Sequence, residues 1–169
     1  MEPATWGLIG TLFGAIIGAG ASIITSVITS QNQVQLQKNR ASLVRKERAR
    51  AFQRETLLEI QDALNDLLRQ NGQAYLIHRK NYKSEGKWGQ SYLPDDLDEN
   101  IRLANSKFVA LVERISDDSL RSDLKELRSN LNRMLFAMSA EEAQDIFHNT
   151  GNSAIHVMEK LGVVLRNQY

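Results

Sequence analysis

Residues 8–28, LIGTLFGAIIGAGASIITSVI, decide the fold, and they lie within a longer segment, residues 3–37, that has no charged side chain. As an α-helix this stretch extends roughly 31 Å at about 1.5 Å per residue, which matches the hydrocarbon core of a bilayer. The sequence therefore predicts a single transmembrane helix, with residues 1–30 as the anchor.

Small residues recur along the predicted span at four-residue spacing, in two adjacent columns. Small side chains let neighbouring helix backbones approach closely, and two columns suit a helix with a neighbour on each side, as in a ring. A dimer with a wide contact and a monomeric glycine-rich anchor are the alternatives. The predicted packing face comprises Gly7, Gly10, Thr11, Gly14, Ala15, Gly18, Ala19, Ser22 and Ser26.

Basic residues follow the hydrophobic segment, whereas Glu2 is the only charged side chain before it. The positive-inside rule then places the N-terminus outside and the body in the cytoplasm, as a single-pass protein of the inner (cytoplasmic) membrane. The basic residues are also expected to contact anionic head groups of the lipid bilayer. They are Lys38, Arg40, Arg45, Lys46, Arg48 and Arg50.

The rest of the chain predicts helices alone. No strand-like alternation occurs, and the prolines are only Pro3 and Pro94. A basic stalk helix is expected over residues 31–77. Apolar residues that recur at three- and four-residue steps predict helices over 97–115 and 120–138, and Ser139 with Glu142 predicts the capping box of a last helix. The fold class is therefore all-α, with residues 96–169 and the upper stalk forming a four-helix bundle.

Residues 78–95 are predicted as a loop because glycine, serine and proline gather there. Tyr82, Trp88 and Tyr92 alternate with lysines in this loop. The aromatic rings are expected to tuck the loop onto the bundle. Stacking on single-stranded bases and insertion among lipid head groups are the alternatives.

Catalytic signatures are absent from the sequence. It contains no Walker loop, dinucleotide fingerprint or H-E-x-x-H motif, and it has no cysteine. Residues 95–169 carry 13 acidic and 9 basic side chains, which argues against bulk nucleic-acid binding there. We therefore predict no catalytic residue, no metal, no cofactor and no small-molecule substrate.

The last predicted helix carries a polar face opposite its apolar stripe. His148 and Asn149 on this face form a candidate subunit interface, because histidine and asparagine can pair by hydrogen bonds across a contact. The alternative is a polar face that water simply solvates.

Residues 151–156 read G-N-S-A-I-H. This resembles the R-N-x-x-x-H motif of HEPN domains, helical bundles that usually pair so that two motifs form a ribonuclease site. Asn152 and His156 match the motif, whereas Gly151 stands where the motif has arginine. A guanidinium that orients and neutralises phosphate cannot be replaced by glycine. The resemblance therefore implies a degenerate HEPN-like bundle that is not expected to be an enzyme.

The layout of the whole chain resembles the small membrane accessory proteins of type VI-B CRISPR systems. That resemblance implies a homo-oligomeric pore that depolarises the membrane in antiviral defence, with an RNA-guided nuclease or its products as a further partner. A membrane-tethered adaptor that recruits a cytoplasmic partner is the second hypothesis. A membrane-bound HEPN ribonuclease that uses Asn152 and His156 is the third.

Overall fold

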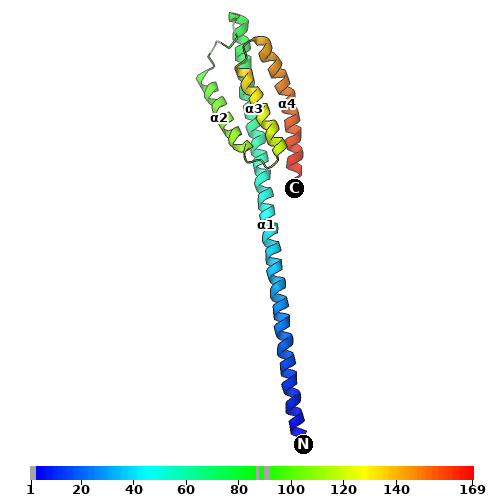
Figure 1. The fold of residues 1–169 in the computed structure, drawn as a ribbon. Coiled ribbons are helices and arrows are strands. Elements are labelled where there is room, and N and C mark those ends of the chain that lie inside the picture. The colour runs from blue at the N-terminus through cyan, green and yellow to red at the C-terminus, as the bar shows by residue number, and fades with distance from the viewer. Residues whose placement is uncertain (1–2, 87, 90–91) are drawn as a thin grey trace. The chain divides into compact units, whose positions relative to one another are not determined.

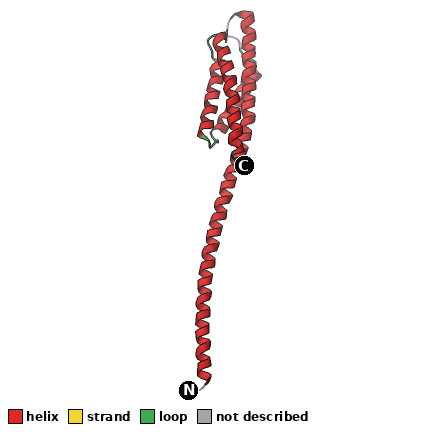
Figure 2. Cartoon of the chain, turned by 90° about the vertical axis from the view of Figure 1, so that its right-hand side faces the viewer, coloured by secondary structure: helices red, strands yellow, loops and turns green. Residues whose placement is uncertain are grey.

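The computed structural model describes residues 3–86, 88–89 and 92–169, with the side chains of residue 22 and of those from 25 onward. Helices make up nearly all of this part of the chain, and it contains no strand, which confirms the all-α prediction (Figures 1 and 2). The helices are α1 (Pro3–Glu85), α2 (Asp95–Val112), α3 (Asp118–Leu135) and α4 (Ala140–Arg166).

The chain divides into two compact units, Met1–Arg48 and Ala49–Tyr169. Within the part that the structure describes, no helix has an apolar stretch long enough to cross a membrane. The side chains of residues 1–21, 23 and 24, on which the transmembrane prediction depends, lie outside the described residues.

The second unit is a four-helix bundle with one principal hydrophobic core. The apolar stripes of α2, α3 and α4 meet the part of α1 that lies beside them in Figure 1. Phe108 of α2 is fully buried at the centre, and Ile115 closes the core at the turn after α2. The other fully or almost fully buried large residues of the core are Leu57, Ile60, Leu64, Leu67, Leu120, Leu124, Leu127 and Leu161.

Side chains cap the N-termini of α3 and α4. Asp117 accepts a hydrogen bond from the backbone N–H of Leu120 at 2.7 Å, and Ser139 accepts one from that of Glu142 at 3.1 Å. Each bond satisfies a backbone donor that the first helical turn leaves unpaired. Helix α4 therefore begins at its predicted capping box, and α3 begins at Asp118, two residues before the predicted start at residue 120.

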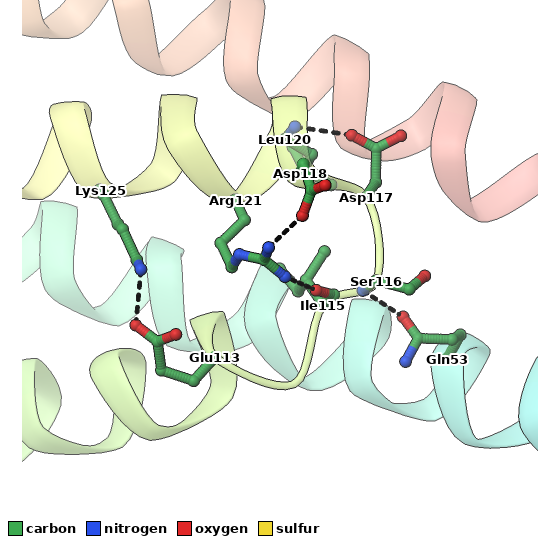
Figure 3. Close-up of polar contacts among 9 residues, drawn as sticks. All are labelled: Gln53, Glu113, Ile115, Ser116, Asp117, Asp118, Leu120, Arg121 and Lys125. Carbon is green, nitrogen blue, oxygen red and sulfur yellow. Dashed lines mark hydrogen bonds and ion pairs between the residues drawn. The ribbon is translucent and has the colours of Figure 1, made fainter.

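Polar contacts hold the turn between α2 and α3 against α1 (Figure 3). Gln53 on α1 accepts from the backbone N–H of Ser116 and donates to the carbonyl of Arg114, both at 2.9 Å. Arg121 donates to the carbonyl of Ile115 and pairs with Asp118. These contacts fix the α2–α3 turn to a single place on the bundle.

Three predicted boundaries need correction, and the first is the end of α2, which lies at Val112 and not at residue 115. Helix α1 continues to Glu85, so the first eight residues of the predicted loop 78–95 are helical, and the chain leaves the helix at Gly86, whose φ is +70°. Nothing between residues 78 and 85 breaks a helix, whereas glycine adopts a positive φ without steric cost. Helix α3 ends at Leu135, and Met138, predicted as its last apolar position, is 90% exposed.

Candidate functional site

The three positions that resemble the HEPN motif lie within one and a half turns of α4, and all three are exposed. Asn152 and His156 do not line a common cavity. Asn152 lines a cavity between α1, α3 and α4, whereas His156 lines a groove between α3 and α4. The two polar side chains of the motif are therefore neighbours on the exposed face of α4, but each borders a different hollow of the bundle.

Acidic side chains surround the groove that contains His156. Asp123 and Glu126 of α3 line it, and Nδ1 of His156 lies 3.8 Å from a carboxylate oxygen of Glu159. Lys160 at the same groove is paired with Asp123 and donates to the hydroxyl of Ser119 at 2.6 Å. The carboxylate of Glu126 repels phosphate, and the charge of Lys160 is already compensated by Asp123. This groove is therefore poorly suited to a nucleic-acid backbone.

The cavity that Asn152 lines is larger and mostly apolar. We call it the glycine-walled cavity, since Gly72 of α1 and Gly151 of α4 both line it. Its volume is about 460 Å³, and Met134, Phe147 and Ile155 supply much of its apolar wall.

An aromatic cluster closes one end of the bundle. The rings of Tyr75 and Phe147 stack with centroids 4.3 Å apart and planes within 7°. Trp88, from the loop after α1, packs on Tyr75, His78 and Tyr82 with centroids 5.9, 5.8 and 6.1 Å away. Trp88 thus attaches the loop to the bundle.

Not every aromatic residue of this loop packs. Tyr92, also expected to tuck the loop onto the bundle, is 98% exposed. Gly86 and Gly89, on either side of Trp88, both adopt a φ of +70°.

His78 lies beneath Trp88 and is 7% exposed. Its Nδ1 and the indole Nε1 of Trp88 are both buried and have no hydrogen-bond partner among the described residues. Burial lowers the pKa of His78 below its ordinary value of 6.5, because the charged imidazolium loses its hydration. The folded bundle therefore favours the neutral imidazole.

We expect the stability of the bundle to fall as the pH drops below about 6.5. In that range the unfolded chain binds a proton at His78 that the folded chain does not, so acid favours unfolding. The stability that neutral His78 contributes is fully present well above pH 6.5. As the pH falls from 6.5 to the lowered pKa of the folded chain, the free energy of unfolding decreases by up to about 1.4 kcal/mol per pH unit. Urea unfolding between pH 7.5 and 5.5, followed by circular dichroism, measures this slope.

The matched variants for this prediction are His78→Gln and His156→Gln. His78→Gln should flatten the pH dependence between pH 7.5 and 5.5. His156→Gln removes an exposed imidazole and should leave the pH dependence of the stability unchanged. An equal slope in the His78→Gln protein and the wild type would show that burial of His78 is not its source.

Some of the remaining residues predicted from the sequence are exposed at the surface. The others have side chains that are not among those the structure describes. His148 and Asn149 are exposed on α4, and the His148 ring lies edge-on to Phe147 at 6.0 Å. Ser22 and Ser26 are exposed on α1, while the other members of the predicted packing face lie outside the described side chains. The basic residues are also exposed; they are Lys38, Arg40, Arg45, Lys46, Arg48 and Arg50.

Sequence reasoning missed Thr150 and His78. Thr150 is 2% exposed and its hydroxyl has no partner among the described residues, although it adjoins the HEPN-like motif in sequence. A helical wheel signals its burial, because Thr150 lies four residues before Ala154 on the buried face of α4. His78 was hidden because it fell in the predicted loop.

Within the described part of the chain, no group of three histidine, cysteine or acidic side chains is arranged to hold a metal ion. Comparisons with protein-family models, curated proteins and solved structures find no match to the chain.

Proposed function

We propose that the protein is a homo-oligomeric, single-pass membrane protein that permeabilises the inner membrane in prokaryotic antiviral defence. The observation that carries this proposal is the uncharged segment over residues 3–37 with its two columns of small residues. Such columns serve helix packing in lipid, where close backbone contact replaces the hydrophobic effect as the source of affinity. The link to antiviral defence depends on the resemblance of the layout to type VI-B CRISPR accessory proteins.

Exposed apolar side chains along α1 support self-association. In the first unit, beyond the predicted span, these are Val34, Leu36, Leu43 and Val44, which are 47–64% exposed. Large apolar side chains that a single chain leaves in water become buried when copies of the chain pack together. A groove of hydroxyl and amide side chains, which includes Ser22, Ser26 and Gln33, also follows α1. In a ring of helices this polar groove is suited to a water-filled lumen.

The ribonuclease alternative has less support. Asn152 and His156 line different cavities, acidic side chains surround His156, and Gly151 lacks the guanidinium of the motif. The adaptor alternative shares the membrane anchor, but in it the helical body recruits a cytoplasmic partner and no pore is formed.

Gly14→Leu is expected to break the oligomer while the protein stays in the membrane. The leucine side chain removes the close backbone approach that a small-residue face allows, whereas it raises the hydrophobicity of the span. The measurement is the native mass of the full-length protein extracted from membranes, together with ion flux into vesicles that contain it. Ile16→Leu, which keeps a bulky residue on the opposite side, is the matched control.

Wild-type protein and Ile16→Leu should give a discrete oligomer and ion flux, and Gly14→Leu should give neither. A monomeric wild-type protein would refute the proposal. A stable oligomer that conducts no ions, and that retains a second protein on purification, would favour the adaptor.

A further inference from the structure

The bundle has a second, smaller hydrophobic core besides the principal one. The principal core ends at Leu67 on α1, at Leu131 on α3 and at Ala154 on α4. Beyond these residues lies a separate cluster, which we call the distal core; its buried residues are Tyr75, Met134, Ala137 and Ala143. Two of these four residues are alanines, so the distal core buries little apolar area and contributes little hydrophobic stabilisation.

A polar layer separates the two cores. On α1 the layer contains Asn71, one turn beyond Leu67, and on α4 it contains Thr150, one turn before Ala154; their exposed fractions are 1% and 2%. The Oδ1 atom of Asn71 and the hydroxyl of Thr150 have no hydrogen-bond partner among the described residues. A buried polar atom without a partner loses its bonds to water and gains none from the protein, so this layer weakens the closed bundle.

The packing is also open at the polar layer. Leu131 of the principal core and Met134 of the distal core both line the glycine-walled cavity, so this hollow lies between the two cores. A Cβ atom added at Gly72 or at Gly151 would meet no atom within 4 Å. Atoms that line a hollow lack contacts on one side, so dispersion contacts that would couple the two cores are missing there.

Helix α4 has its lowest helix propensity where it crosses the polar layer. Residues 148–153 read H-N-T-G-N-S, in the interior of a helix that extends from Ala140 to Arg166. None of these residue types is a strong helix former, and glycine loses the most conformational freedom on folding. The helix is therefore easiest to interrupt between the part that covers the distal core and the part that covers the principal core.

We propose that the bundle opens at the polar layer, with residues 140–147 of α4 and the α3–α4 turn detaching from α1 as one unit. Residues 154–166 stay packed on the principal core. Opening breaks the stack of Phe147 on Tyr75 and uncovers Tyr75, which is 4% exposed in the closed bundle. The polar layer thus acts as a hinge that covers or uncovers an aromatic surface while the principal core stays folded. This inference goes beyond the proposed membrane function, and no residue of the anchor takes part in it.

Hydrogen exchange of backbone amides in the full-length protein tests the proposal. Amides 144–150 donate to carbonyls of the detaching part of α4, whereas amides 157–163 donate to carbonyls beyond the polar layer. Measured by mass spectrometry and corrected for intrinsic rates, the first set should exchange about a hundredfold faster than the second. Its exchange should also depend less on low concentrations of urea, because a local opening exposes less surface than global unfolding does.

Glycine and threonine variants locate the hinge. Gly151→Ala adds a methyl group that meets no neighbouring atom and should slow the exchange of amides 144–150 by about two- to fivefold, since alanine is the better helix former. Thr150→Val keeps the branched shape, removes the orphaned hydroxyl and should slow this exchange by about fivefold or more.

Gly162→Ala is the matched control, because it makes the same change on α4 beyond the polar layer. Its Cβ atom would lie 3.4 Å from the guanidinium of Arg166, which is the far end of a flexible side chain. This variant should leave the exchange of amides 144–150 unchanged.

Three outcomes would overturn the proposal. One is equal protection and equal urea dependence in the two sets of amides, since the bundle would then open as a whole. Another is protection that rises gradually from residue 144 to residue 163 with no step at the polar layer, which would show fraying of the helix end. The third is an equal effect of Gly151→Ala and Gly162→Ala on amides 144–150.

Discussion

Replacement of Ile16 and Ile17 by lysine is expected to release the protein from the membrane. Both residues lie at the centre of the predicted span, residues 8–28. Each exchange costs about 3–4 kcal/mol on the insertion scale, so the pair costs about 6–8 kcal/mol, which is more than a ten-thousandfold change in the insertion equilibrium. The measurement is the fraction of protein that stays in the membrane pellet after alkaline carbonate extraction.

The control for this variant places the same two charges outside the predicted span. Val34→Lys with Leu36→Lys alters two exposed positions of α1, and this protein should remain in the pellet. If the Ile16→Lys, Ile17→Lys protein stayed in the pellet as well, residues 8–28 would not be the membrane anchor.

Phe108→Ala is expected to lower the free energy of unfolding of the bundle by about 3–5 kcal/mol. Phe108 is fully buried and packs among the apolar residues of the principal core. The truncation removes a large apolar side chain and leaves a void in the core, so the loss of burial and the added void act together. The shift in the urea midpoint of unfolding measures this loss.

Phe136→Ala makes the same chemical change at a surface position. Phe136 is 80% exposed just after α3, so its truncation should change the stability by less than about 0.5 kcal/mol. Similar losses for the two variants would mean that Phe108 does not lie at the centre of the core.

Two polar contacts near the α2–α3 turn show which contacts depend on neighbouring residues in the sequence and which depend on tertiary packing. Asp117, which caps α3, is close in sequence to Leu120, from whose backbone N–H it accepts a hydrogen bond, so this contact is local. Lys125 donates to Glu113 at 2.8 Å and so holds the pKa of Glu113 below its ordinary value, yet this pair joins two helices across a turn. No helical spacing relates the two residues, so only the packing of α2 on α3 reveals the pair.

The candidate site also has one feature that the sequence shows and one that only the packing of the helices decides. The short spacing of Asn152 and His156 on one helix was evident from the sequence, but which neighbouring helices face each side chain was not. Asn152 adjoins the glycine-walled cavity and His156 adjoins an acidic groove. That separation depends on how α4 is rotated against α1 and α3, which is a tertiary property.

The sequence alone determined that the described chain is helical, that α4 begins after Ser139, and most of the apolar residues that form the core. These features depend on residues within a few turns of one another, through the 3.6-residue period and the chemistry of the caps. Only the tertiary structure decided that Gly72, separated in sequence from Gly151 by two whole helices, lines the same cavity, and that the buried Thr150 hydroxyl and His78 Nδ1 have no hydrogen-bond partner among the described residues. Cavities and orphaned polar groups arise from the packing of distant segments, so no local pattern encodes them.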